Sequence, residues 1–303
     1  MKKNKILIGT RASKLAMIYA NRAKNEIGKV FSGEIEIVKI TTDGDKNQKD
    51  RLSEIGGKGL FSKKIEEELI HKNIDVAVHS LKDMPSEETL GLITNCFLKR
   101  NAPEEILITK ENKKFSELNS NAIIGTSSYR REFQLKRIRN DLNYKTIRGN
   151  IDTRISKINN KDYDGIILAK AGIKSLNLNH LISQEFSTQE IIPSAGQGIV
   201  SIQCRESDIE VIKLLDKVND KIAGISAQAE RKVLKILEGD CHTAVGIFSD
   251  IKKDNFEIRG ELFSLDGNQR FFKIVKDKIS NFLKVSIELG NYLKRESKDS
   301  YKK

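Results

Sequence analysis

Short apolar runs of strand length alternate with amphipathic stretches through the first two hundred residues. The segment from Lys5 to Gly9 predicts a buried strand, and Ala16, Ala20 and Ile27 then recur at helical spacing behind Ser13, a possible N-cap. This alternation is typical of α/β proteins with largely parallel sheets. The sequence therefore predicts the α/β class for most of the chain.

The chain of 303 residues exceeds the usual size of a single domain. We predict a discontinuous first domain of residues 1–98 plus 197–216, because the apolar segment from Ile199 to Cys204 could return to the first sheet. Residues 99–196 form a second α/β domain, and residues 217–303 a small α+β third domain. Two chain crossings between the first two domains predict a hinge with a ligand cleft. The lysine-rich last eight residues are expected to be disordered.

The chain carries 54 Lys and Arg against 42 Asp and Glu, a formal charge of +12. This excess favours anionic partners: nucleic acid, an acidic membrane or a carboxylate-rich small molecule. Three cysteines in so long a chain argue against a disulfide framework and for a reducing compartment. The apolar run in the basic N-terminus is too short for the core of a signal peptide, and no stretch approaches the ~20 apolar residues of a membrane span. We expect a soluble cytoplasmic protein with no membrane partner.

Arginines gather where the α/β pattern places loops at the carboxyl ends of strands, which is the usual ligand edge of such sheets. They are Arg11, Arg130, Arg131, Arg148 and Arg154. A planar guanidinium binds carboxylates bidentately, so several of them converging from two domains suit a polycarboxylate. For any one of them the alternative is a surface ion pair.

Two neighbouring segments add to this edge. Thr126, Ser127 and Ser128 supply hydroxyls and backbone N–H groups at a helix start, which is compatible both with anion binding and with plain N-capping. Asp83 follows a buried strand and is anionic near neutral pH, so it could stabilise a cationic intermediate. An isolated aspartate at such a position is more often a turn former or a helix cap.

Cys241 stands in a loop after Gly239, where a thiol can be a nucleophile or an attachment point. Cys96 and Cys204 lie in apolar, strand-like contexts and are expected to be inert. The glycine-rich segment from Gly56 to Gly59 lacks the Lys-Ser or Lys-Thr pair of a phosphate loop and is better explained as a mobile lid. Four scattered histidines and no cysteine pair predict no metal site.

Several segments in order along nearly the whole chain resemble porphobilinogen deaminases (hydroxymethylbilane synthases). The matching segments are Ile8 to Ser13, Gly56 to Phe61, His79 to Pro85, Gly125 to Arg131, Arg148 to Arg154, Leu168 to Gly172, Pro193 to Gly198 and Gly239 to Cys241. The resemblance implies two domains like type II periplasmic binding proteins with a central cleft, followed by a small α+β domain. It also implies a dipyrromethane cofactor joined by a thioether to Cys241.

The resemblance further implies a transferase of porphyrin and heme biosynthesis. Enzymes of this family condense four porphobilinogen molecules head to tail with loss of ammonia and then release hydroxymethylbilane by hydrolysis. Each pyrrole carries an acetate and a propionate, which accounts for the arginines. We expect a cytoplasmic monomer whose partner is the porphobilinogen substrate.

The family's site residues are carried over by position. Asp83 would be catalytic, stabilising positive charge on pyrrole nitrogens. Residues implied to bind the cofactor are Cys241, Lys82, Asp83, Ser128, Arg130, Arg131 and Arg148. Residues implied to bind substrate are Arg11, Ser13, Lys58 in the active-site lid, Ser80, Thr126, Ser127, Arg148, Arg154 and Gln197. This chain departs from the family at Ser175, where many members have a basic residue, and at Ala244, where the cysteine loop usually has proline.

Two other functions fit parts of the sequence. A non-enzymatic protein that binds anions or polycarboxylates would use the same arginine-lined cleft, but it gives Cys241 no role. A nucleic-acid-binding protein is favoured by the charge alone and would interleave aromatic residues with the basic ones. Aromatic residues make up 6% of this chain, with no Trp, and Tyr129 is the one inside an arginine cluster. We therefore expect no nucleic-acid partner.

Overall fold

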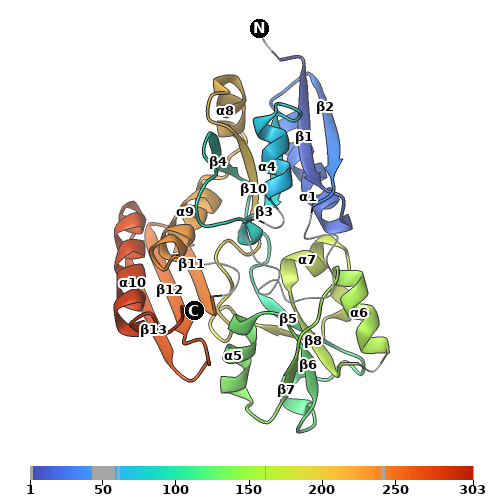
Figure 1. The fold of residues 1–303 in the computed structure, drawn as a ribbon, viewed down its shortest axis with the longest axis vertical. Coiled ribbons are helices and arrows are strands. Elements are labelled where there is room, and N and C mark those ends of the chain that lie inside the picture. The colour runs from blue at the N-terminus through green and yellow to red at the C-terminus, as the bar shows by residue number, and fades with distance from the viewer. Residues whose placement is uncertain (1–2, 43–58, 60–61, 161, 240–242, 303) are drawn as a thin grey trace.

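The computed structural model describes residues 3–42, 59, 62–160, 162–239 and 243–302 (Figure 1). Its first sheet has the strand order β2-β1-β3-β10-β4. The strands are β1 (Lys5–Arg11), β2 (Glu34–Ile40), β3 (Val76–Ser80), β4 (Leu92–Phe97) and β10 (Val200–Arg205). The helices around it are α1 (Lys14–Gly28), α4 (Lys63–Ile70) and α8 (Ile209–Asp216). We call these elements lobe 1.

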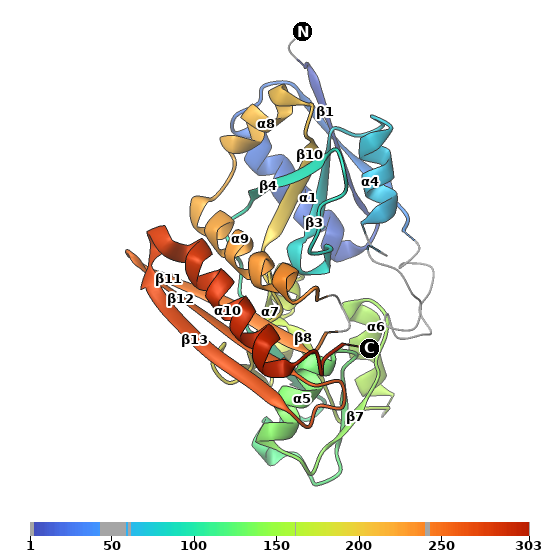
Figure 2. The same ribbon diagram turned by 60° about the vertical axis from the view of Figure 1, so that its left-hand side comes forward.

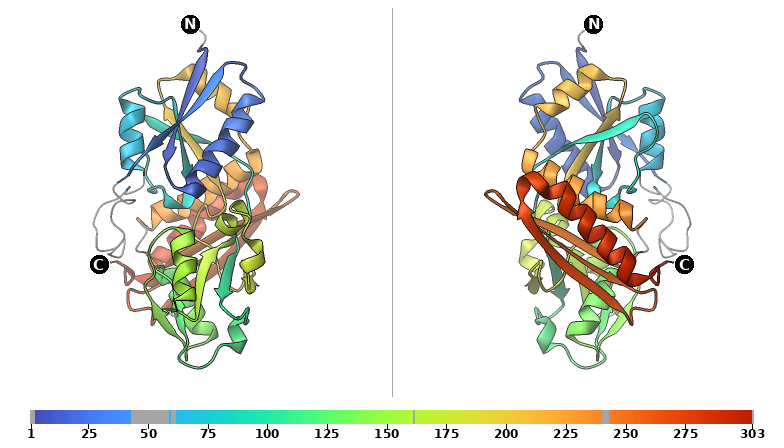
Figure 3. Two further views of the ribbon diagram at one scale, coloured as in Figure 1. Left: turned by 90° about the vertical axis from the view of Figure 1, so that its right-hand side faces the viewer. Right: turned by 90° about the vertical axis from the view of Figure 1, so that its left-hand side faces the viewer.

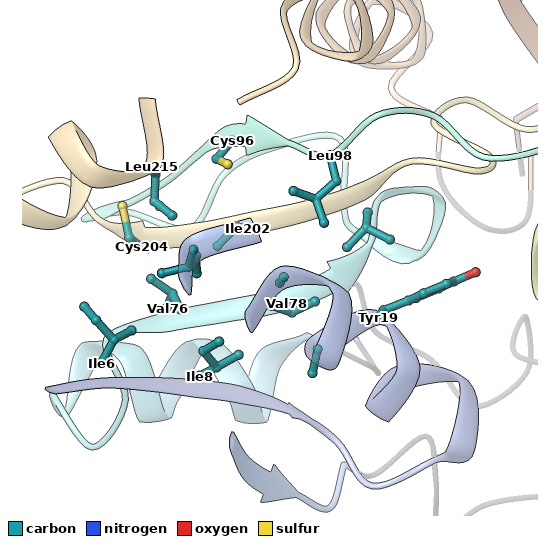
Figure 4. Packing of buried hydrophobic residues seen from close by; sticks show 14 of the residues in the cluster. Ile6, Ile8, Tyr19, Val76, Val78, Cys96, Leu98, Ile202, Cys204 and Leu215 are labelled. Carbon is teal, nitrogen blue, oxygen red and sulfur yellow. The ribbon is translucent and has the colours of Figure 1, made fainter. Parts of the chain in front are cut away.

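Lobe 1 forms around the strands β1, β3 and β10, which are largely buried on both faces. On one face Ile6 and Ile8 of β1 pack with Ala20 and Ile27 of α1 in a buried cluster (Figure 4). On the other face Ile65 and other buried residues of α4 cover the sheet. The predicted cap is present, since the Ser13 hydroxyl accepts a hydrogen bond from the backbone N–H of Ala16 at 3.3 Å.

The second sheet has the order β7-β6-β8-β5-β9. Its strands are β5 (Glu105–Thr109), β6 (Ile123–Gly125), β7 (Asn143–Lys145), β8 (Gly165–Ala169) and β9 (Gln184–Phe186). With α5 (Tyr129–Ile138), α6 (Ile151–Asn159) and α7 (Lys170–Ser175) they make lobe 2. In each five-stranded sheet the strand in the fourth place, β10 or β5, runs antiparallel to both neighbours. The prediction of largely parallel sheets is confirmed.

The C-terminal unit is α+β, as expected. It contains α9 (Lys221–Ile236), the antiparallel strands β11 (Val245–Lys252), β12 (Asn255–Phe263) and β13 (Arg270–Lys278), and α10 (Phe282–Ser297). The two long helices lie together on one face of the sheet (Figure 2). The expected disorder at the end of the chain is wrong for the residues described, because Tyr301 is buried and its hydroxyl donates to the carbonyl of Leu237 at 3.0 Å.

Single 3₁₀ turns occur at Leu81–Asp83, Phe115–Glu117, Asn179–Leu181 and Ile279–Asn281. Among the described residues no helix is long and apolar enough to cross a membrane.

Two crossing segments connect the lobes, one after β4 and one before β10. They run side by side, since the N–H of Leu98 donates to Val200 at 2.9 Å and that of Asn101 donates to Gly198 at 2.8 Å. Gly198 has a φ of +83°, and a Cβ there would lie 2.6 Å from the carbonyl oxygen of Asn101. The close approach of the two crossings therefore requires glycine at this position.

The C-terminal unit lies against one side of this junction (Figure 3). Glu230 of α9 is fully buried, and Arg100 of the first crossing binds it with both terminal nitrogens, at 2.6 and 3.2 Å. The same carboxylate accepts the backbone N–H groups of Gly196 in the second crossing and of Ser249 in β11. One buried anion thus joins both crossings to the C-terminal sheet.

Candidate active site

A cavity of about 630 Å³ opens between the two lobes. Its walls come from the N-terminal part of α1, the end of β3, the starts of α6 and α7, and the second crossing. Nine of the residues predicted for the site line it, namely Arg11, Ser13, Ser80, Lys82, Asp83, Arg131, Arg148, Arg154 and Gln197. The expected cleft is present, and five of these nine side chains are cationic.

Lys82 and Asp83 stand at the end of β3 because the chain leaves the sheet there in a 3₁₀ turn. Buried Leu81 anchors the turn, and its N–H donates to the carbonyl of Ile199 at 3.0 Å. The Lys82 ammonium donates to the Gln197 side chain at 3.4 Å. The pKa of Lys82 is lowered to about 8, chiefly by burial and also by the Arg131 charge, while the Asp83 carboxylate opposes the shift.

Arg131 is fixed by a buried carboxylate behind the cleft. Glu105, at the start of β5, is fully buried and lies 2.8 Å from Nη2 of Arg131 and 2.6 Å from Nη2 of Arg130. Burial alone would raise the pKa of Glu105, but the two arginine charges outweigh it and lower that pKa to about 2. The Nε of Arg131 is buried with no hydrogen-bond partner among the described residues.

Arg130 is placed differently from its neighbour. Its Nη1 donates to the carbonyl of Ile192 at 2.8 Å, and the side chain is not part of the cleft wall. Arg130 instead shares Glu105 with Arg131.

Arg154 adds charge from α6, and its Nε donates to the carbonyl of Gly149 at 2.8 Å. The pKa of Arg154 is lowered to about 10, chiefly by burial and also by the charges of Arg131 and Arg148, while Asp83 opposes the shift. Cations from two segments of lobe 2 therefore converge opposite a carboxylate of lobe 1.

The hydroxyl groups of the three residues before α5 make hydrogen bonds to nearby backbone groups. The Thr126 hydroxyl accepts the N–H of Ser128 at 3.2 Å, Ser127 donates to the carbonyl of Ile147, and Ser128 caps the helix through the N–H of Arg131 at 3.5 Å. None of the three is part of the cleft wall among the described residues. Lys58 and Cys241 lie outside the described residues.

Sequence reasoning missed two residues of this region. Glu105 opens an otherwise apolar strand segment, and a charge in such a segment needs buried partners, which could have revealed it. Tyr19 of α1 lines the cleft, and it was not singled out from the sequence.

The described residues contain no group of three or more His, Cys, Asp or Glu side chains that could hold a metal ion. Fold and site together define a two-lobed α/β protein whose interlobe cleft gathers several cations in the cavity that Asp83 lines, an arrangement suited to a polycarboxylate.

Comparison with known proteins identifies the family. The model described as "Porphobilinogen deaminase, dipyromethane cofactor binding domain" matches residues 6–213, and "Porphobilinogen deaminase, C-terminal domain" matches residues 225–296. The porphobilinogen deaminase of Alkaliphilus metalliredigens is 39% identical over 95% of this chain and 92% of its own length. That of Exiguobacterium sibiricum is 42% identical over 88% of this chain and 87% of its own. The chain belongs to the porphobilinogen deaminase family.

Its activity is accordingly that of a hydroxymethylbilane synthase, a transferase, with porphobilinogen as the family's substrate and dipyrromethane as the cofactor. Among solved structures, a putative methionine-binding lipoprotein of Bacillus subtilis aligns with a TM-score of 0.44 and 12% identity, covering 74% of this chain and 93% of that one. A periplasmic binding protein of Salmonella typhimurium aligns with a TM-score of 0.42 and 14% identity, covering 75% and 97%.

The residues present fit the cofactor. A dipyrromethane of this type carries acetate and propionate groups on both rings, and the cleft offers arginines from both lobes. The buried Nε of Arg131 supplies an unused donor in that wall. Guanidinium groups pair with carboxylates by charge-assisted hydrogen bonds, so the donor set and the anion match in chemistry.

Proposed function

We propose that porphobilinogen condensation takes place in the interlobe cleft, with Asp83 as the catalytic residue and Cys241 as the attachment point of the dipyrromethane. The observation that supports this assignment is the convergence of four arginines and Lys82 on the cavity that contains Asp83. A set of cations recognises the acetate and propionate groups, and the Asp83 carboxylate faces the reacting pyrrole.

The chain's own residues bind and orient the substrate and stabilise the charge that develops on it. Arg11 of lobe 1 and Arg154 of lobe 2 hold substrate carboxylates from opposite walls. As the aminomethyl C–N bond breaks, ammonia leaves with the bonding electrons, and the Asp83 carboxylate stabilises the positive charge on the pyrrole nitrogen. A preorganised carboxylate in a site that excludes water stabilises such charge more than water does. When bound, the dipyrromethane supplies the free pyrrole carbon to which the first substrate unit is joined.

We extend the residue assignment to the rest of the set. For the cofactor we propose Lys82, Arg131 and Arg148, with Ser128 and Arg130 acting through Arg131. For the substrate we propose Ser13, Lys58, Ser80, Thr126, Ser127 and Gln197 beside the two arginines already named. The positions of Ser13, Ser80 and Gln197 in the cleft wall support their assignment.

We also propose the division into residues 1–98 plus 197–216, 99–196 and 217–303. The return of β10 to the sheet of lobe 1 supports the discontinuous first domain. A monomer in the cytoplasm, with no nucleic-acid or membrane partner, completes the proposal. The buried free thiols of Cys96 and Cys204 support a reducing compartment.

The intact mass of the purified protein tests the attachment site. The wild type should carry the added mass of two linked pyrroles and give the colour of a free pyrrole with Ehrlich's reagent, and Cys241→Ser should show neither. Cys96→Ala is the matched control, because it removes a buried thiol and should keep the added mass. An added mass that survives in Cys241→Ser would refute this attachment site.

Asp83→Asn tests the catalytic assignment. The amide occupies the same space without the charge, so we expect an unchanged melting temperature, a retained cofactor mass and a hydroxymethylbilane kcat at least about a hundredfold lower. A variant with wild-type kcat would show that Asp83 is not catalytic.

A further inference from the structure

A buried cluster of apolar side chains joins lobe 2 to the C-terminal unit where α5 packs against β12 (Figure 2). Its buried members are Phe133 of α5, Ala244 and Phe263 of β12. The ring centroids of Phe133 and Phe263 lie 5.7 Å apart, and Tyr129, one turn earlier in α5, stacks on Phe133 at 5.8 Å. Aromatic pairs at such separations attract one another beyond the effect of the area that they bury. The cluster therefore holds this end of the C-terminal sheet against α5.

The hairpin between β12 and β13 packs directly on the Phe133 ring. Gly267 in this hairpin has a φ of +76°, and a Cβ there would lie 2.7 Å from the ring. Arg137, one turn after Phe133 in α5, adds an ion pair with Glu261 of β12 at 2.9 Å. Because the Arg137 side chain is about half exposed, this pair contributes little. Close packing around Phe133 thus makes the larger contribution to this contact.

Ala244 extends this contact towards the proposed attachment point. It follows Cys241 by three residues in the chain, and its carbonyl accepts the N–H of Phe263 at 3.1 Å. The described residues on either side of the segment that contains Cys241 lie close together, since a Cβ on Gly239 would be 3.4 Å from Oγ1 of Thr243. The end of that segment at Ala244 is therefore held against α5.

The same helix carries an arginine of the cleft wall. Arg131 lies two residues before Phe133 in α5, and Glu105 of lobe 2 binds its guanidinium at 2.8 Å. Glu230 joins the C-terminal unit to the two crossings, whereas Phe133 joins that unit to the helix that holds Arg131. A shift of the Phe133 contact therefore moves the C-terminal unit relative to this arginine.

We infer that Phe133 is a positioning residue for the condensation: its packing against the C-terminal unit sets the place of the cofactor on Cys241 relative to Arg131. This inference rests on the proposed function. Cys241 belongs to the C-terminal unit, whereas Arg131 and Arg148, which are proposed to bind the cofactor carboxylates, belong to lobe 2. The two units must therefore keep a fixed register. Misplacement of a reacting group by about 1 Å can slow a reaction about a hundredfold.

Phe133→Leu tests the inference in the holoprotein. Leucine keeps the site apolar but removes the ring contacts, so the cofactor mass should be retained while the kcat for hydroxymethylbilane falls about tenfold. The KM for porphobilinogen should change less than about twofold, because Arg11 and Arg154 remain in the cleft wall to bind substrate. Without substrate, the Phe263 amide should exchange hydrogen about tenfold faster, because its bond to the Ala244 carbonyl lies within the cluster.

Phe115→Leu is the matched control. Phe115 is a buried phenylalanine of lobe 2 that contacts Phe186 edge to face at 5.5 Å, and it belongs neither to the cleft wall nor to the cluster. Its replacement should lower the melting temperature by a similar amount but leave kcat and the exchange of the Phe263 amide unchanged. If Phe115→Leu lowered kcat as much as Phe133→Leu does, the effect would be general destabilisation and the inference would fail.

Phe263→Leu changes the other side of the same contact. We expect it to lower kcat as Phe133→Leu does, and the double variant to add little to either single change. A lower kcat in Phe133→Leu with a wild-type kcat in Phe263→Leu would overturn the inference, as would a wild-type kcat or exchange rate in Phe133→Leu. A wild type that forms no hydroxymethylbilane would refute the proposed function. The exchange measurement needs no turnover, so it would still decide whether Phe133 holds Ala244 in place.

Discussion

Replacing Glu105 by glutamine tests whether a buried anion holds the arginines of lobe 2 in place. The substitution keeps the shape of the side chain and removes the charge that Arg130 and Arg131 share. A pKa lowered from 4.5 to about 2 corresponds to roughly 3 kcal/mol in favour of the charged form in the folded protein. Loss of one partner from a buried ion pair independently suggests about 3–5 kcal/mol. We therefore expect the free energy of unfolding to fall by about 3–5 kcal/mol at pH 7.

The stabilisation by Glu105 should depend on pH, and the direction of its pKa shift sets the direction of that dependence. Because the pKa of Glu105 is lower in the folded protein, its stabilisation is complete above the unfolded value of about 4.5 and is lost as the pH falls towards 2. The difference between wild type and Glu105→Gln should shrink to less than half by pH 3. Urea denaturation at pH 7 and pH 3 measures both values.

Glu132→Gln is the control, because Glu132 makes an ordinary i,i+4 pair with Lys136 on the surface of α5. It should change the free energy of unfolding by less than about 0.5 kcal/mol. Glu105→Gln should also raise the KM for porphobilinogen, since Arg131 loses the group that orients it. A variant with wild-type stability and KM, or a destabilisation that is the same at both pH values, would refute the reasoning.

Three further predictions concern the cleft and the junction. The pKa of Lys82, lowered to about 8, implies that its ammonium loses charge as the pH rises through 8, so the wild-type KM should increase from pH 7 to 9 while that of Lys82→Arg stays flat. Glu230→Ala leaves Arg100 buried without its anion and should lower the free energy of unfolding by about 3–5 kcal/mol, measured by urea denaturation. Gly198→Ala combines a φ of +83° with a Cβ 2.6 Å from a carbonyl oxygen and should cost at least about 1 kcal/mol, seen as a lower melting temperature.

The regular elements of the fold were predictable where apolar periodicity persists over enough residues. The apolar segments from Glu34 to Ile40 and from Gly165 to Ala169 predict strands, and the structure has strands with these bounds. The segment from Tyr144 to Arg148 also predicts a strand, but the strand spans Asn143–Lys145, and the chain turns at Gly149, with a φ of +108°, next to Arg148 in the cleft wall. The three-residue strand Gln184–Phe186 was not predicted, since three residues show no period.

The candidate site was predictable to the level of segments but not of single side chains. Arg130 and Arg131 are adjacent in the same helix, so their side chains point about 100° apart and cannot both face the cleft. Which of them does so depends on how α5 packs against Glu105, a partner 25 residues away in the chain.

The grouping of cations also explains why the cleft is suited to a ligand that grows. The charges of Arg131 and Arg148 lower the pKa of Arg154, so the three guanidinium groups repel one another. Bound carboxylates relieve that repulsion, so part of the electrostatic cost of folding the site becomes binding free energy. In the proposed function each pyrrole brings two carboxylates to these cations, and Asp83 supplies negative charge close to the reacting atoms. On that proposal the cation set holds successive units while the same aspartate stabilises the positive charge at each step.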